Sequence, residues 1–119
     1  MATVSDDEIE AVRALVAAIP EGQVTTYGDL ATAVGLSSPR IVGWIMRTDS
    51  ADLPWHRVVP ANGRPAAHLE TRQLDRLREE GVPITDGRIH MSDCRWLPAI
   101  DAPRSVTDVK GFFGSEEAT

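Results

Sequence analysis

The segment Pro54-Trp55-His56-Arg57-Val58-Val59 places an indole, an imidazole and a guanidinium in consecutive positions. An indole can stack on a flat ligand such as a nucleic-acid base, a contact worth roughly 1–3 kcal/mol per base. It cannot supply a thiolate, the form of cysteine that attacks a carbon atom in covalent group transfer. The segment therefore indicates a binding site without a nucleophile. A tryptophan after a proline is also compatible with a core position, where its N–H is satisfied.

Cys94 is the only cysteine, and with His90 it forms a His-x3-Cys pair of residue types that bind zinc. Because no second pair stands nearby, we expect no metal and no cofactor, and a buried or tail position for the thiol. A single cysteine cannot form an internal disulfide, which favours a reducing compartment, the cytoplasm. The acidic first ten residues argue against a signal peptide, and no apolar run is long enough to span a membrane.

The chain is acidic as a whole, but its charge is unevenly distributed. Its 119 residues suit one domain, and 42% apolar and 25% charged residues are ordinary for a globular protein. The net charge of −6 argues at first against nucleic acid as a partner. Residues 1–39 and 79–119 carry −5 and −4, whereas residues 40–78 carry +3, with seven arginines. Guanidinium groups that suit phosphates therefore surround Trp55, although a solvated surface would also account for them.

Capping residues predict where the first two helices begin and end. Ser5-Asp6-Asp7-Glu8 is a capping box that opens a helix, and Pro20-Glu21-Gly22 ends it. After a short extended segment, Thr26 caps a second helix over residues 27–34, which Gly35 closes. The buried face of the first helix is expected to consist of Ile9, Val12, Val16 and Ile19.

A third helix is predicted from Ser38 to about residue 47, because Pro39 suits the first helical position, where a missing N–H costs nothing. Its inward face is expected to consist of Ile41, Val42, Ile45 and Met46. The second and third helices, joined by a tight turn, form a helix-turn-helix. The small residue, turn glycine and aliphatic residue typical of that motif are Ala31, Gly35 and Ile41. Two helices packed in an enzyme core would give the same pattern.

The second half of the chain is predicted to contain short strands and one helix. Residues 58–59 form a strand, and residues 60–63 form a turn with an Asn-Gly tip. Residues 70–80 form a helix that a glycine ends. Residues 82–84 and 88–91 form a hairpin with an Asp-Gly turn.

Periodicity fades beyond residue 98, where glycine, proline and polar residues dominate. We therefore expect one domain over residues 1–98 and a flexible C-terminal tail over residues 99–119. The expected fold class is mostly α with small β elements, in a single winged helix-turn-helix-like domain.

Four segments give the sequence a family resemblance. In chain order they are Ile19-Pro20-Glu21-Gly22-Gln23-Val24-Thr25-Thr26-Tyr27-Gly28, Pro39-Arg40-Ile41-Val42-Gly43, Pro54-Trp55-His56-Arg57-Val58-Val59 and Arg76-Leu77-Arg78-Glu79-Glu80-Gly81-Val82. Their order and spacing resemble the DNA-binding domain of the methylated-DNA–protein-cysteine methyltransferase family, over roughly residues 8–91. Those enzymes repair 6-O-alkylguanine by taking the alkyl group onto the cysteine of a Pro-Cys-His-Arg-Val motif. Trp55 occupies that position here, so the resemblance implies an alkyltransferase-like protein that binds the lesion without repairing it.

The resemblance implies DNA contacts for three residues of the helix-turn-helix. Tyr27 matches the tyrosine that lies against the phosphate beside the flipped nucleotide. Arg40 matches the arginine finger that fills the space left by the extruded guanine. Gly43 would let the DNA backbone approach, at a helix cost of about 1 kcal/mol relative to alanine. The alternatives are a core tyrosine, a surface arginine and close packing of another helix.

Around the missing nucleophile, the resemblance makes Trp55 a wall of the base pocket. His56 and Glu80 match the histidine and glutamate that activate the cysteine in the enzymes. Without a thiol to activate, we expect them to hold the pocket together through a hydrogen bond. Arg57 is expected to share this network and to bind DNA.

Two departures from the family pattern affect the expected site. The loop over residues 64–69 is shorter than usual, so the residue that senses the modified base is not assigned. Arg64 and His68 are the candidates, and Arg64 is expected to bind DNA. The asparagine hinge before the active strand is replaced by residues 48–52.

The sequence therefore predicts a protein that binds duplex DNA containing alkylated guanine, flips the base toward Trp55 and catalyses nothing. The resemblance further implies transfer of the lesion to nucleotide excision repair proteins, and a place at the nucleoid if the host is bacterial. A helix-turn-helix regulator of transcription is the main alternative, but it leaves Trp55, His56 and Glu80 without a role. An active alkyltransferase using Cys94 is a third, although that cysteine lies far from the motif.

Overall fold

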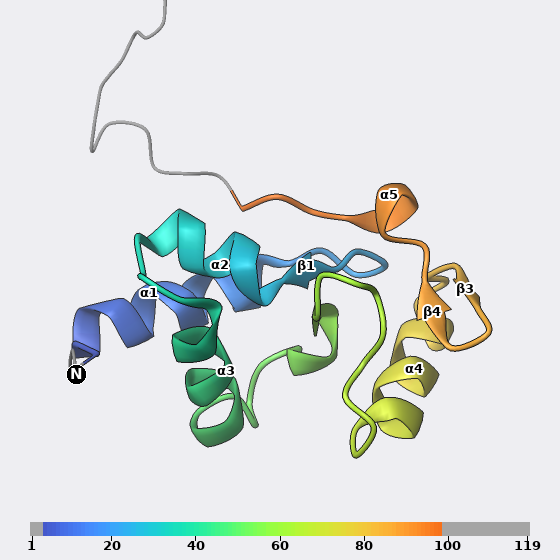
Figure 1. Cartoon of the computed structure of the whole chain (residues 1–119), viewed down its shortest axis with the longest axis horizontal. Coiled ribbons are helices and arrows are strands. Elements are labelled where there is room, and N and C mark those ends of the chain that lie inside the picture. The colour runs from blue at the N-terminus through green and yellow to red at the C-terminus, as the bar shows by residue number, and fades with distance from the viewer. Residues whose placement is uncertain (1–3, 99–119) are drawn as a thin grey trace, which may run out of the picture.

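Helices make up most of the regular structure in the computed structural model, which describes residues 4–98. In chain order the elements are α1 (Asp6–Ala18), β1 (Thr25–Thr26), α2 (Tyr27–Val34), α3 (Pro39–Thr48), the 3₁₀ helix η1 (Trp55–Arg57), β2 (Val58–Val59), α4 (Glu70–Glu79), β3 (Ile84–Thr85), β4 (Arg88–Ile89) and α5 (Met91–Cys94). Figure 1 shows α1, α2 and α3 at one end and α4 with the β3–β4 hairpin at the other. The expected mostly α fold with small β elements is confirmed. The predicted tail, 99–119, lies outside the described residues.

The first three helices begin at the capping residues that the sequence predicts. Both hydrogen bonds of the capping box are present at the start of α1. The hydroxyls of Thr26 and Ser38 accept backbone N–H groups in the first turns of α2 and α3. Gly35 ends α2 with a φ of +85°, a left-handed conformation that glycine adopts without strain. No helix within residues 4–98 is long and apolar enough to cross a membrane.

Two hydrophobic clusters divide the core. The first lies among α1, α2 and α3 and consists of Val12, Val16, Ile19, Leu30, Ala31, Val42, Ile45 and Val58. The second lies among α4, the hairpin and α5 and consists of Val24, Val59, Leu74, Leu77, Val82, Ile89 and Cys94. The short strands β1 and β2 pair in parallel between them. Because successive strand side chains point to opposite faces, Val58 enters the first cluster and Val59 the second.

The last described segment also connects the two clusters. Cys94 belongs to the second cluster, whereas Trp96 packs against the first. Between them, Arg95 forms a parallel bridge with Val24, and its guanidinium pairs with Asp29 of α2 at 2.6 Å. Figure 1 shows the segment running over β1 and α2.

The second half of the chain follows its prediction with two corrections. β2 and α4 form where expected, and the hairpin forms at the expected turn, whose residues Asp86 and Gly87 have φ values of +51° and +76°. Its first strand, predicted over residues 82–84, is Ile84–Thr85, because the Val82 N–H bonds the Leu77 carbonyl at the end of α4 and Pro83 has no N–H to donate. The strand predicted to continue to Met91 is wrong beyond Ile89, because residues 91–94 form the single helical turn α5. Met91 and Cys94, three residues apart, both pack on the second cluster. A single helical turn contains only one such spacing, so its sequence shows no helical period.

Candidate nucleic-acid interface

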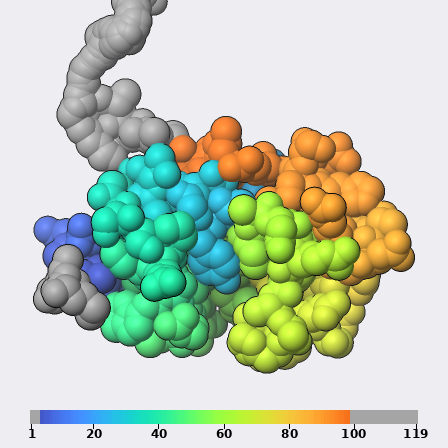
Figure 2. All heavy atoms as spheres, viewed as in Figure 1, coloured from blue at the N-terminus to red at the C-terminus, as the bar shows by residue number. Residues whose placement is uncertain are grey.

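A cavity of about 960 Å³ opens between α3 and the segment that leads into α4. Its volume lies near the upper end of the range of ligand pockets, about 300–1,000 Å³. Figure 2 shows the cleft between these two parts at the lower edge of the molecule. The lining residues are Tyr27, Pro39, Arg40, Gly43, Met46, Arg47, Thr48, Asp49, Ser50, Ala51, Asp52, Trp55, Ala66, His68, Leu69 and Arg72. Four of the predicted site residues, from α2, α3 and η1, therefore meet at one cavity.

One face of α3 lines the cavity. Arg40, Gly43 and Arg47 recur at spacings of three and four residues, which places them on one side of the helix. A Cβ at Gly43 would meet only the Nη1 of Arg47, at 3.6 Å, so no other described helix packs against this glycine. Close helix packing therefore does not explain Gly43. Val42 and Ile45, on the other face, are fully buried in the first cluster.

Tyr27 combines the two alternatives that the sequence leaves open. Its half-buried ring packs against the first hydrophobic cluster, and the residue also lines the cavity. Burial raises the pKa of Tyr27, an effect that the nearby Arg47 only partly offsets. The phenol therefore remains neutral and can donate a hydrogen bond to a phosphate.

Trp55 is half-buried and opens the 3₁₀ helix at the wall of the cavity. A buried glutamine on α4, Gln73, fixes this helix, because its Nε2 donates to the carbonyls of His56 at 3.0 Å and Val58 at 2.9 Å. Gln73 is only 2% exposed, so these two bonds satisfy an amide that would otherwise be costly to bury. The residue pattern gives no indication of this support for the position of the indole.

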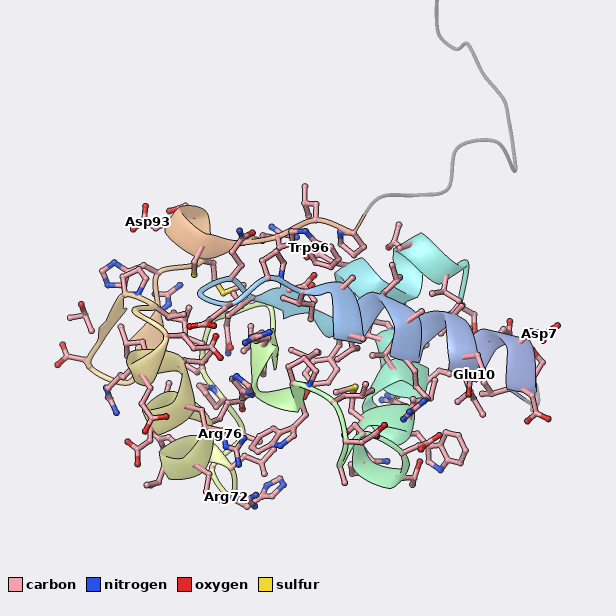
Figure 3. All side chains as sticks on the ribbon, turned by 180° about the vertical axis from the view of Figure 1, so that it is seen from behind. Asp7, Glu10, Arg72, Arg76, Asp93 and Trp96 are labelled. Atoms are coloured by element: carbon pink, nitrogen blue, oxygen red, sulfur yellow. The ribbon has the colours of Figure 1, made fainter. Side chains whose placement is uncertain are left out.

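Two arginines of α4 lie against the indole. The guanidinium carbons of Arg72 and Arg76 are 5.2 Å and 5.5 Å from the ring centroid of Trp55, within cation–π distance. Figure 3 shows both side chains leaving α4 on the same side. Sequence analysis missed both residues, although their spacing of four places them on one helix face.

A cluster of charged groups lies behind Trp55, around the carboxylate of Glu80. His56 Nε2 lies 2.6 Å from Glu80 Oε2, and Arg57 donates to both carboxylate oxygens. The Gly22 N–H donates to Glu80 Oε1 at 3.0 Å, and Arg57 Nη1 donates to the Ile19 carbonyl at 2.9 Å. Burial alone would raise the pKa of Glu80, but the hydrogen bonds from Arg57, Gly22 and His56 lower it to about 2. This Glu80 cluster joins the ends of α1 and α4 to η1.

The cluster limits what its members can do elsewhere. Every nitrogen of the Arg57 guanidinium donates within the protein, so the geometry gives this residue a structural role, and the expected DNA contact stays a prediction. His56 Nδ1 is buried and has no hydrogen-bond partner within the described residues. Arg64 donates to the Asp86 carbonyl and does not line the cavity, whereas His68 does. Of the two candidates for sensing a modified base, only His68 reaches the cavity.

The acidic rim of the cavity is paired with one arginine of α1. Asp49 and Asp52 belong to the segment that replaces the expected hinge, and both line the cavity. Arg13 bonds Asp52 at 2.7 Å and Asp49 at 3.2 Å. The hydrogen bond from Arg13 lowers the pKa of Asp52. Because these carboxylates are paired, they oppose an approaching phosphate less than free acids would.

Cys94 does not take part in the cavity. It is buried in the second hydrophobic cluster, as expected, and its thiol donates weakly to the His90 carbonyl. Burial raises the pKa of Cys94, so the thiol is not activated as a thiolate. The geometry therefore disfavours alkyl transfer to Cys94. Among the described residues, no group of three His, Cys, Asp or Glu side chains could hold a metal ion.

Helices α2 and α3 form a helix-turn-helix, and an arginine-lined cavity lies on α3. These two features place the protein in the class of helix-turn-helix DNA-binding domains. The family model of the 6-O-methylguanine DNA methyltransferase DNA-binding domain matches residues 8–82, and the chain belongs to this family. The resemblance inferred from the four sequence segments is thereby confirmed.

Relatives and solved structures agree with this assignment. The chain is 38% identical over 92 residues to Alkyltransferase-like protein 1 of Schizosaccharomyces pombe, covering 67% of this chain and 85% of that protein. It is 43% identical over 91 residues to the DNA base-flipping protein of Escherichia coli, covering 69% of this chain and 68% of that protein. The crystal structure of S. pombe Atl1 in complex with damaged DNA containing O6-carboxymethylguanine matches with a TM-score of 0.71 at 35% identity, over 79% of this chain and 98% of that chain.

Proposed function

We propose that the protein binds duplex DNA containing 6-O-alkylguanine, accepts the flipped base in the cavity beside Trp55 and leaves the alkyl group in place. The observation that carries this proposal is the position of Trp55. It lies where the family has its acceptor cysteine, at the wall of a cavity that also contains Tyr27, Arg40 and Gly43. The names of two relatives, alkyltransferase-like and base-flipping, support the same function.

The arrangement supports flipping through a division of roles. The glycine face of α3 approaches the DNA backbone, Tyr27 donates to a phosphate, and Arg40 enters the space that the base leaves. Flipping costs a few kcal/mol, and stacking of the base on Trp55 returns roughly 1–3 kcal/mol. Contacts from Arg40 and the phosphates supply the remainder.

No step transfers the alkyl group, because the cavity contains no thiol. A bound lesion that is not repaired must be removed by other proteins. We therefore assign the protein a marking role and propose nucleotide excision repair as the pathway that takes over. The proposed location is the cytoplasm, at the nucleoid if the host is bacterial.

Binding to matched duplexes tests the first part of the proposal. Fluorescence anisotropy at one fixed salt concentration should give at least tenfold tighter binding to a duplex with 6-O-methylguanine than to the same duplex with guanine. That factor corresponds to about 1.4 kcal/mol. Equal affinities for the two duplexes would instead favour the helix-turn-helix regulator of transcription.

The mass of the intact protein tests the absence of chemistry. After incubation with excess modified duplex, the mass should be unchanged, for the native protein and for Cys94→Ala alike. A gain of one alkyl group in the native protein that Cys94→Ala abolishes would show that the protein is an alkyltransferase.

A further inference from the structure

We propose that Arg72 and Arg76 make the cavity select 6-O-alkylguanines whose alkyl substituent carries a negative charge, such as a carboxylate. This inference rests on the proposed function and specifies its ligand class. The guanidinium carbons of these two arginines lie 5.2 Å and 5.5 Å from the centre of the Trp55 ring, on the helix that forms one side of the site.

The charge of these two arginines is not neutralised by the protein. Within residues 4–98, neither Arg72 nor Arg76 forms an ion pair or a side-chain hydrogen bond, and both are exposed. Arg78, on the same helix, pairs with Asp75 at 3.4 Å. The pair at Trp55 therefore remains free to bind an anion.

The acidic groups of the cavity do not balance this charge either. The two carboxylates that line it, Asp49 and Asp52, are already held by Arg13. Arg40, Arg47 and Arg72 line the same cavity. A ligand that enters it consequently meets an excess of positive charge in a partly enclosed site, where screening by salt is weaker than at an open surface.

The helix that carries the two guanidinium groups is also held in place. α4 is fixed by Leu74 and Leu77 in the second hydrophobic cluster and by the bonds of Gln73 to the segment that carries Trp55. A base stacked on the indole would bring its 6-O-substituent within reach of a flexible arginine side chain. A carboxylate there forms charge-assisted hydrogen bonds with a guanidinium, whereas a methyl group gains only packing contacts.

The competing role for these arginines is contact with the phosphates of the duplex. Such a contact would strengthen binding to every duplex by the same factor, because a phosphate carries no information about the lesion. Selection by substituent charge instead changes the ratio between two lesions of the same size. That ratio is the quantity to measure.

The experiment compares four duplexes of one sequence, containing guanine, 6-O-methylguanine, 6-O-(carboxymethyl)guanine or its neutral amide, 6-O-(carbamoylmethyl)guanine. The native protein should bind the carboxymethyl duplex at least fivefold more tightly than the amide duplex. Arg72→Gln and Arg76→Gln should each reduce this ratio, and the double variant should bring it close to one. Arg78→Gln, which removes the same charge from the same helix, should leave the ratio unchanged.

The outcomes separate this inference from the proposed function. Equal affinity of the native protein for the acid and the amide overturns charge selection, while tighter binding of both than of guanine leaves the proposed function intact. An equal loss on all four duplexes in Arg72→Gln and Arg76→Gln identifies a phosphate contact and also overturns it. Charge selection is likewise overturned if Arg78→Gln changes the ratio of acid to amide affinity as much as Arg72→Gln does. If no lesion binds more tightly than guanine, the proposed function fails, and the inference with it.

Discussion

Arg40 is the residue whose proposed role can be separated most cleanly from ordinary charge. It lies in the first turn of α3, close to the cap, where a cation is unfavourable because helix N-termini carry partial positive charge. It has no side-chain partner within the described part of the chain, and it lines the cavity. An arginine kept at this position is consistent with insertion into the duplex.

We predict that Arg40→Ala loses affinity for modified duplex at least tenfold more than for plain duplex. A finger that replaces a flipped base contributes only when the base has left the stack. Anisotropy titrations of both duplexes measure the difference, and a fluorescent base analogue beside the lesion should brighten with the native protein only. Arg78→Ala is the control, since Arg78 lies outside the cavity. Parallel losses of Arg40→Ala on both duplexes would leave Arg40 as a phosphate contact.

We infer a structural role for Glu80, because it has no nucleophile to activate. Its carboxylate neutralises Arg57, whose side chain is only 17% exposed, and accepts the Gly22 N–H. Removing one partner of a buried ion pair leaves the other charge without compensation.

We predict that Glu80→Gln lowers the free energy of unfolding by about 3 kcal/mol, and the thermal midpoint by at least about 10 °C. Urea unfolding and thermal melts give both quantities. Glu79→Gln, at the neighbouring exposed glutamate, should lower the free energy of unfolding by less than about 0.5 kcal/mol. Similar midpoints for the two variants would mean that the Glu80 cluster contributes little to stability.

At the scale of elements, α3 has an exposed aromatic side chain outside the face that lines the cavity. Trp44 stands one turn after Arg40 and is 45% exposed, which is unusual for so large an aromatic side chain. Apolar side chains at a minor-groove interface can wedge against base steps without reading the lesion. The helix thus offers an apolar contact beside its arginines.

We predict that Trp44→Ala weakens binding to modified and plain duplex by the same factor, about threefold to tenfold, and leaves the thermal midpoint unchanged. The equal loss follows because Trp44 is outside the cavity that receives the base. Leu97→Ala, at the other large exposed apolar side chain of the described region, should change neither affinity. A loss confined to modified duplex would place Trp44 in lesion recognition instead.

Local signals predicted most of the elements. The capping residues Ser5, Thr26 and Ser38 mark the starts of α1, α2 and α3 because a cap acts within its own turn. The parallel pairing of β1 with β2 could not be foreseen, since Thr25 and Val58 are far apart in the chain. α5 was missed because a single turn is too short to show a period.

The site residues within the family motif could be predicted, whereas those whose positions depend on helix packing could not. Tyr27, Arg40 and Trp55 fall in the motif segments, and the structure brings them to one cavity. Arg72 and Arg13 carry no motif. Their positions over the indole and against the acidic rim depend on how α4 and α1 pack, which the residue pattern does not specify.

At the scale of the whole molecule, the net charge of −6 conceals an arginine-lined face. The acidic residues that keep the overall charge negative lie in residues 1–39 and 79–119, while Arg13 pairs with the two that reach the cavity and offsets one of their two charges. Local compensation therefore determines which part of an acidic protein can accept DNA.

We predict that stability falls as the pH is lowered from about 5 toward 2. The folded pKa of Glu80, about 2, lies below its ordinary value of 4.5, so its contribution is complete above pH 5 and is lost as the carboxylate becomes protonated. The pKa of Asp29, lowered by Arg95 despite its burial, acts in the same direction. Urea unfolding at pH 7, 4 and 3 should show the loss, and Glu80→Gln should show a smaller one. Equal pH dependence of the two proteins would contradict the assigned role of Glu80.

The Glu80 cluster also bears on how a protein of this kind arises. In the genetic code, a single-base change converts a cysteine codon into the tryptophan codon, so a thiol at position 55 is lost in one mutational step. A change at Arg57 or Glu80 instead breaks the ion pair that joins α1, η1 and α4, and a variant that folds poorly is removed by selection. The alkyl acceptor is thus the member of the motif that evolution can discard first. We therefore expect His56, Arg57 and Glu80 to be retained for folding.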